Sequence, residues 1–194
     1  MKGVVIALTM ALLIAQAAFA GPAAVPVKSF EVQSVHLGDD LTHVFLSLGA
    51  PQALQVIGGG KEPGLIQLLY FKQDDILSID ITDLPDNTVA EIEVSGNSWK
   101  TNSPIKVGDG VDKAMQSVGK PDSIDDLAAQ KKWMLEQAGD DALMRKLIEK
   151  NSGDSALVYS DLGIYAEYDK DKRMIKTVRL FQPTGLTEQI AYKL

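Results

Sequence analysis

Two histidines lie close to two aspartates near the start of the chain, and this grouping is the one best suited to metal chemistry. The residues are His36, Asp39, Asp40 and His43. A helix over this stretch brings Asp39 and His43 to the same side. Imidazole and carboxylate groups are common zinc ligands, so a metal-dependent envelope hydrolase using His36, Asp39 and His43 is one hypothesis. The chain has no further histidine and no cysteine to complete the site, so we expect Asp39 to cap a helix instead.

Three other short motifs are similar to functional sites but lack residues that those sites need. Asp169 to Arg173 is similar to a calcium loop, but the glycine and the glutamate expected further along are missing. Gly58 to Gly60 is followed by no Lys-Ser or Lys-Thr pair, so we expect an ordinary loop and not a phosphate-binding loop. No serine lies in a Gly-x-Ser-x-Gly elbow. We therefore predict a protein that is not an enzyme and that uses no metal or other cofactor.

One stretch of sequence occurs twice and organises the chain. Residues 35–51 and 105–121 align without a gap. Glycine makes up only about 7% of ordinary sequence, so two matched glycines at one offset are unexpected by chance. We therefore expect two copies of one unit. The identical pairs are Gly38/Gly108, Asp39/Asp109, Ser47/Ser117, Gly49/Gly119 and Pro51/Pro121.

Each copy predicts a short amphipathic helix. Asp39 and Asp109 are expected to be the N-caps, and Gly49 and Gly119 are expected to end the helices with positive φ. A helix this short is marginal alone, so it must bury its apolar side against another element. Four residues of each copy have helical spacing: Leu41, Val44, Phe45 and Leu48 in the first, and Val111, Ala114, Met115 and Val118 in the second.

After each helix the spacing of the apolar residues changes from a period of 3.6 residues to one of 2. This change predicts antiparallel strands with one solvent-exposed face. Residues 52–64 are expected to form a loop. The second copy has extra residues between its helix and its strands, and we predict that they are helical, beginning at Ser123. The strands are expected at 65–71, 76–81, 89–94, 157–159, 164–168 and 174–181, and the extra helices at about 124–138 and 141–150.

These elements predict an α+β fold of two tandem repeats. Each repeat is a short helix or helix pair packed on an antiparallel β-meander, and the second contains a helical insertion. The expected boundaries are a signal peptide at 1–20, a flexible leader at 21–32, a first repeat at 33–102, a second repeat at 103–183 with its insertion at about 123–152, and a tail at 184–194.

The N-terminus has the three regions of a secretory signal peptide. Met1 to Gly3 carries a positive charge, Val4 to Ala15 is apolar, and Ala18 to Ala20 has small residues at the expected spacing. We expect cleavage after Ala20 and an extracytoplasmic protein, either periplasmic or secreted. The apolar run is too short for a comfortable membrane span, and no later run is longer, so no stable membrane insertion is expected.

The net charge and the absence of cysteine limit the classes of partner and of chemistry that we expect. The formal net charge of −7 argues against nucleic acid and anionic lipid, and favours basic protein partners. No cysteine is present, which removes disulfides, thiolate catalysis and a lipid anchor at the cleavage site. We expect a monomer.

The repeated motif also resembles a known group of proteins. The apolar-x-apolar-Gly-Asp head, the apolar helix face and the Gly-x-Pro stop before the strands resemble the β-lactamase inhibitor protein (BLIP) fold. Each half is similar to the SmpA/OmlA domain of the BamE-like barrel-assembly lipoprotein, and Trp99 to Thr101 adds to the likeness. The resemblance covers most of residues 33–183 and implies a secreted bacterial envelope protein that recognises another protein. The chain departs from the lipoprotein because it lacks the anchoring cysteine.

The surface expected to bind a protein partner is the sheet face that the helices leave uncovered. Alternation along the strands places polar, aromatic and arginine residues on that face, a mixture that suits protein interfaces. The candidates are Ser78, Asp80, Glu91 and Glu93 from the first copy, and Tyr165, Glu167, Thr177, Arg179 and Phe181 from the second.

Overall fold

The computed structural model describes residues 30–57, 64–82 and 87–182. Within them the protein is α+β, with an eight-stranded antiparallel sheet, a two-stranded ribbon and four helices. The expected signal peptide, most of the leader, Gly58 to Gly60 and the tail lie outside the described residues. The helices are α2 (Leu41–Leu48), α3 (Val111–Val118), α4 (Ala128–Gln137) and α5 (Ala142–Asn151). The strands are β1 (Glu31–Val32), β2 (Val35–His36), β3 (Ala53–Ile57), β4 (Leu65–Lys72), β5 (Asp75–Thr82), β6 (Val89–Ser95), β7 (Ser123–Asp126), β8 (Ser155–Tyr159), β9 (Ile164–Asp169) and β10 (Met174–Phe181).

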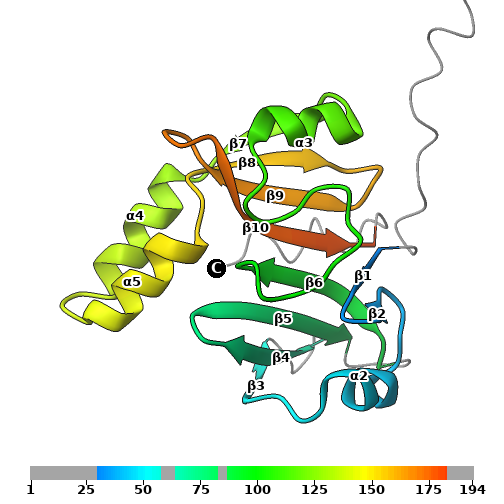
Figure 1. Ribbon diagram of the computed structural model, residues 1–194. Coiled ribbons are helices and arrows are strands. Elements are labelled where there is room, and N and C mark those ends of the chain that lie inside the picture. The colour runs from blue at the N-terminus through cyan, green and yellow to red at the C-terminus, as the bar shows by residue number, and fades with distance from the viewer. Residues whose placement is uncertain (1–29, 58–63, 83–86, 183–194) are drawn as a thin grey trace, which may run out of the picture.

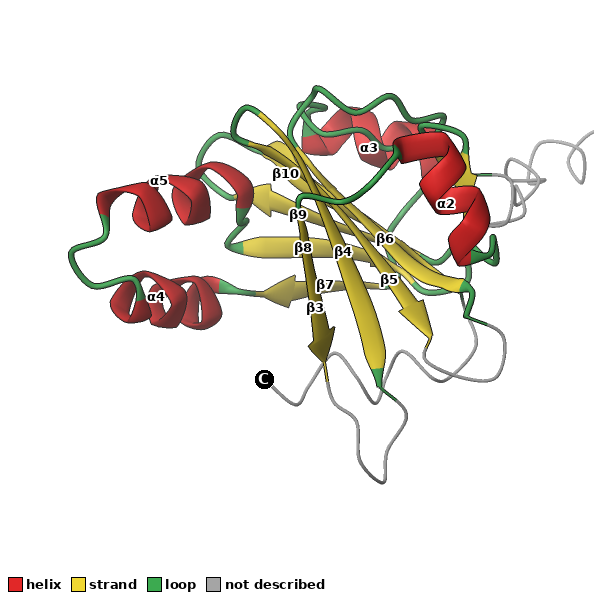
Figure 2. Ribbon diagram, turned by 90° about the horizontal axis from the view of Figure 1, so that it is seen from below, coloured by secondary structure: helices red, strands yellow, loops and turns green. Residues whose placement is uncertain are grey.

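The sheet consists of two four-stranded meanders that meet at their last strands. Its order is β3-β4-β5-β6-β10-β9-β8-β7, and β6 pairs with β10 antiparallel, with Val94 opposite Val178. The helices α2 and α3 lie on the same side of the sheet, whereas α4 and α5 form a hairpin beside the ends of the strands (Figures 1 and 2). Strands from the two ends of the chain are therefore neighbours in one sheet.

The core lies on the sheet face that α2 and α3 cover. Leu77 and Ile79 in β5 and Ile92 in β6 are fully buried, in the alternation predicted for strands with one apolar face. In α2 only Val44 is fully buried. Leu41 and Leu48 are partly buried and pack against the same core, as expected, but Phe45, also expected on the buried side, is 39% exposed.

The two halves end their first helices in the same way. Gly49 has φ 77° and Gly119 has φ 95°, so the predicted positive φ is confirmed at both. Their ψ values of −164° and −167° place them in a region that essentially only glycine occupies. The carbonyl oxygens accept matching bonds: the Tyr70 hydroxyl donates to Gly49 at 3.2 Å, and the Tyr159 hydroxyl donates to Gly119 at 3.1 Å.

The turn before each helix is also matched. The N–H of Gly38 donates to the Val89 carbonyl at 2.8 Å, and the N–H of Gly108 donates to the Ile175 carbonyl at 2.9 Å. Each glycine has a φ near 90°, which a residue with a Cβ rarely adopts. In both halves this turn ties the start of the helix to the last strand of a hairpin.

The predicted N-caps are wrong by one residue. The Asp39 carboxylate accepts from the backbone N–H of His36 at 2.7 Å, and the Asp109 carboxylate accepts from that of Lys106 at 3.0 Å. Both aspartates therefore point back and close the turn instead of capping the helix. The actual N-caps are Asp40, which accepts from the His43 N–H at 2.8 Å, and Gly110, which has no capping side chain.

Two segments predicted as something else are edge strands. Residues 53–57 were expected to lie in a loop, but they pair with β4 at five positions. Ser123 was expected to begin a helix, but residues 123–126 pair with β8, and the helices of the insertion begin only at Ala128. Pairing with a neighbouring strand outweighs local sequence preference in both places. The segment that was expected to be wholly helical therefore begins with a strand of the sheet.

Candidate functional site

All nine residues expected to bind a partner lie on one face of the sheet, opposite the core. Asp80 lies across from Glu91, and Glu93 lies between Ser78 and Arg179. In the second half, Arg179 lies across from Tyr165. Side chains that are directly opposite in neighbouring strands share a face. We call this set the charged face: Ser78, Asp80, Glu91, Glu93, Tyr165, Glu167, Thr177, Arg179 and Phe181.

The charged face is less open than expected. Ser78, Asp80 and Thr177 are buried, and the other six residues are half-buried. One cause is α5, whose last residue packs on the face: the Thr177 hydroxyl donates to the carbonyl of Asn151. The expectation of a freely exposed face is therefore wrong, because alternation predicts which side a residue faces but not what covers that side.

Arg179 is the centre of the charged face. Its Nη2 lies 2.7 Å from Glu93 Oε2, and its Nε lies 3.0 Å from Glu91 Oε1. The guanidinium also lies over the Tyr165 ring, 5.4 Å from the ring centroid. Burial disfavours its charge, but the attraction of Glu93 and then Glu91 outweighs burial and raises the pKa of Arg179. The guanidinium is therefore a fixed positive charge.

Four carboxylates surround this one cation. Burial raises the pKa of Glu91 to about 7, opposed by attraction to Arg179 and reinforced by repulsion from Asp80 and Glu93. Burial is also the largest cause that raises the pKa of Asp80 and that of Glu167. A half-buried carboxylate without its own cation is costly to ionise. The charged face thus gains negative charge as the pH rises through neutrality.

A ladder of amide side chains runs from the charged face to the sheet edge. Gln67 Nε2 donates to Asp80 Oδ1 at 3.0 Å, and Gln55 Nε2 donates to Gln67 Oε1. The Ser78 hydroxyl also donates to Asp80 Oδ1, at 3.3 Å. We did not expect Gln55 or Gln67 in the site, although alternation in residues 65–71 places Gln67 opposite the apolar side. Gln55 was missed because β3 was missed.

The histidines expected in the alternative metal site do lie near one carboxylate. Asp39 Oδ2 is 3.4 Å from His36 Nδ1 and 3.5 Å from His43 Nε2. Across residues 30–57, 64–82 and 87–182, however, no three His, Asp or Glu side chains are arranged to hold a metal ion. In the second half Lys113 pairs with Asp109 at 2.5 Å, at the positions equivalent to His43 and Asp39. A basic group beside this aspartate is thus shared by the two halves.

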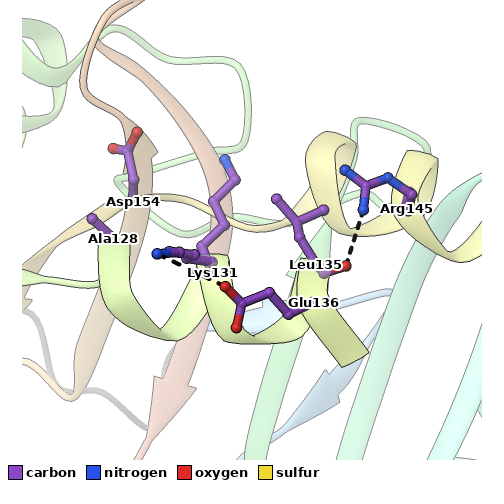
Figure 3. Close-up of a pocket in the computed structure, with 7 residues that line it drawn as sticks. Ala128, Lys131, Leu135, Glu136, Arg145 and Asp154 are labelled. Atoms are coloured by element: carbon purple, nitrogen blue, oxygen red, sulfur yellow. Dashed lines mark hydrogen bonds and ion pairs between the residues drawn. The ribbon is translucent and has the colours of Figure 1, made fainter. Parts of the chain in front are cut away.

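A pocket of about 470 Å³ lies at the α4–α5 hairpin (Figure 3). Arg145 Nη1 donates to the Leu135 carbonyl at 3.0 Å, and Lys132 pairs with Glu136 at 3.8 Å. The Arg145 bond joins α5 to α4, and the Lys132–Glu136 pair lies within α4, so the pocket is explained by the hairpin itself. Its lining is Ala128, Lys131, Lys132, Leu135, Glu136, Arg145 and Asp154.

Comparison with known proteins gives no relative from which a function could be inferred. No protein-family model, curated protein or solved structure matches the chain. None of the helices in the described part of the chain is long and apolar enough to cross a membrane. The function is therefore argued from the chain's own geometry.

Proposed function

We propose that this protein is an exported, non-enzymatic recognition module that binds a basic segment of a protein partner at the charged face. The observation that carries the proposal is the charge imbalance around Arg179, where four carboxylates share one guanidinium and one of them, Glu167, is also attracted to Lys131. A lysine or arginine from a partner would supply the missing positive charge in a half-buried place, where electrostatic attraction is stronger than in water.

Two further features support a protein partner. The Tyr165 ring beside Arg179 belongs to the residue types that dominate binding energy at protein interfaces. The net charge of −7 attracts basic partners over distance and speeds their association at low salt. A cation bound near Glu91 lowers the pKa of that carboxyl, so binding near neutral pH should release a proton.

We also propose that residues 33–102 and 103–183 are tandem copies of one unit, with BLIP-like architecture and BamE-like halves. The repeated sequence and the matched bonds of Tyr70 to Gly49 and of Tyr159 to Gly119 support the duplication. Export, with cleavage after Ala20, is supported by the sequence of residues 1–20. Together these features favour a bacterial cell envelope protein, periplasmic or secreted.

The test uses the chain without residues 1–20 as bait in a bacterial envelope extract. The double variant Asp80→Asn, Glu91→Gln removes excess charge from the charged face but keeps the Glu93–Arg179 pair. The control Glu136→Gln, Glu149→Gln removes the same number of carboxyl groups from the exposed side of α4 and α5. We expect a basic protein to bind the parent and the control, and to bind the charged-face variant about tenfold more weakly.

Binding of the captured protein is then measured by calorimetry at low and high salt. The expected results are an affinity that falls with salt and a proton release that disappears in the charged-face variant. Equal binding to both double variants would place the interface elsewhere and refute the proposal.

A further inference from the structure

The strand β3 is one edge of the eight-stranded sheet. It pairs with β4 on one side, and no described strand pairs with its other side. Leu54 and Val56 are 57% and 64% exposed, although Leu68, which lies opposite Leu54, is fully buried. An edge strand with unpaired backbone groups and apolar side chains is a template on which another strand can pair.

The opposite edge of the same sheet is protected. β7 has only four residues, and two of them are Asp125 and Asp126. Asp126 Oδ2 lies 3.2 Å from Lys170 Nζ, so the last position of the edge carries an ion pair. Short length and charge are the usual devices that stop edges from pairing with other chains. β3 is one residue longer than β7, and its five residues include no charge and no proline.

We propose that β3 pairs antiparallel with β3 of a second copy of this chain, in a register centred on Gln55. The resulting dimer has two-fold symmetry, and one continuous sheet crosses both molecules. The sequence of β3 is complementary to itself in this register. Leu54 lies opposite Val56 of the second copy, and Gln55 lies opposite its own equivalent. Aliphatic cross-strand pairs of this kind stabilise sheets.

The amide ladder provides the polar half of the same interface. Gln55 already donates one N–H to Gln67, which in turn donates to Asp80. A glutamine amide has two N–H donors and a carbonyl oxygen. Two Gln55 side chains facing each other across the two-fold axis can exchange hydrogen bonds, so the ladder continues from one molecule into the next. Stacked glutamine ladders are a known source of stability in paired strands.

A second copy fits this edge better than a charged partner does. The contact between the two β3 strands involves only uncharged residues, so the charged side chains of each molecule lie outside it. The expectation of a monomer took no account of this edge, since residues 52–64 were expected to form a loop. The dimer does not depend on the charged face, and its failure would leave the proposed function unaffected.

The register is tested by disulfide trapping, because the chain contains no cysteine. Gln55→Cys places two thiols directly opposite each other, where the Cα atoms of paired residues lie about 4.5–5.5 Å apart, within disulfide range. Leu54→Cys is the matched control on the same strand. Its two thiols lie diagonally, about 7–8 Å apart and out of reach. We expect about tenfold more disulfide-linked dimer from Gln55→Cys than from Leu54→Cys in a glutathione buffer.

Sedimentation velocity tests the association without cross-linking. The parent should show a monomer–dimer equilibrium that depends on concentration, and Val56→Lys should be monomeric because it places a charge on the edge. Ile124→Lys makes the same change on β7, where Ile124 is 58% exposed, and should dimerise like the parent. A parent that stays monomeric at every concentration, or equal trapping of both thiol variants, would overturn the proposal. A monomeric parent whose β3 is protected by an extended segment of another protein would also overturn it.

Discussion

Replacing Glu91 with glutamine should remove a loss of stability that the parent suffers as the pH rises. The folded protein raises the pKa of Glu91 from its ordinary 4.5 to about 7, and burial is the largest cause. Between these values the folded state holds a proton that the unfolded chain has released. Stability from this group is therefore fully present below pH 4.5 and is lost as the pH rises to 7. The difference between a pKa of 4.5 and one of about 7 corresponds to about 3 kcal/mol. The Glu91 side chain is only 21% exposed, so solvent screens its charge little.

The assay is urea unfolding followed by circular dichroism between about pH 4 and pH 8. The quantity plotted is the unfolding free energy of Glu91→Gln minus that of the parent. It should be constant below pH 4.5, rise through the window from 4.5 to 7, and level off about 3 kcal/mol higher. Glu136→Gln, which removes a carboxylate from the exposed part of α4, controls for net charge. A difference that is flat with pH, or that falls, would refute the role given to burial.

Three further substitutions test the features that the two halves have in common. Tyr70→Phe and Tyr159→Phe each delete one hydroxyl bond to a glycine carbonyl, so each should lower the unfolding free energy by about 1 kcal/mol. The double variant should lose the sum, measured by urea unfolding, and a clearly smaller loss would mean that the two sites are coupled. Gly119→Val should cost about 1 kcal/mol or more, because φ at this position is 95°. An unchanged melting curve for Gly119→Val would contradict the argument from φ.

The features that sequence predicted well depend on near neighbours in the chain. The helix α2 is recognised from apolar residues three and four apart, and its end is recognised from Gly49. The same signals appear around Gly119, so both helices could be placed before any tertiary contact was known. The alternation in β5 and β6 likewise separates the apolar side, with Leu77, from the polar side, with Ser78.

The features that sequence missed depend on residues far away in the chain. β3 contains no turn residue, but nothing within it shows that it pairs with β4. The amide ladder requires Gln55, Gln67 and Asp80 to be in register across three strands. Asp39 and Asp40 are both suitable helix caps, and only the turn geometry decides that Asp40 takes that role. Long-range pairing and local competition between equal groups are the two causes of these errors.

The segment that contains α4 and α5 contacts carboxylates in both halves of the sheet. The insertion reaches the first half of the sheet, where Lys150 Nζ lies 2.7 Å from Asp75 Oδ1. After α5 the chain returns across the charged face, and the N–H of Gly153 donates to Glu167 Oε2 at 3.0 Å. A Cβ at Gly153 would lie 2.6 Å from the Tyr168 nitrogen, so glycine is needed for this close approach. Both contacts oppose burial, which raises the pKa of a carboxyl group. The hydrogen bond from Lys150 helps to outweigh burial at Asp75, whose pKa is lowered, whereas the Gly153 N–H offsets burial only in part at Glu167, whose pKa is raised.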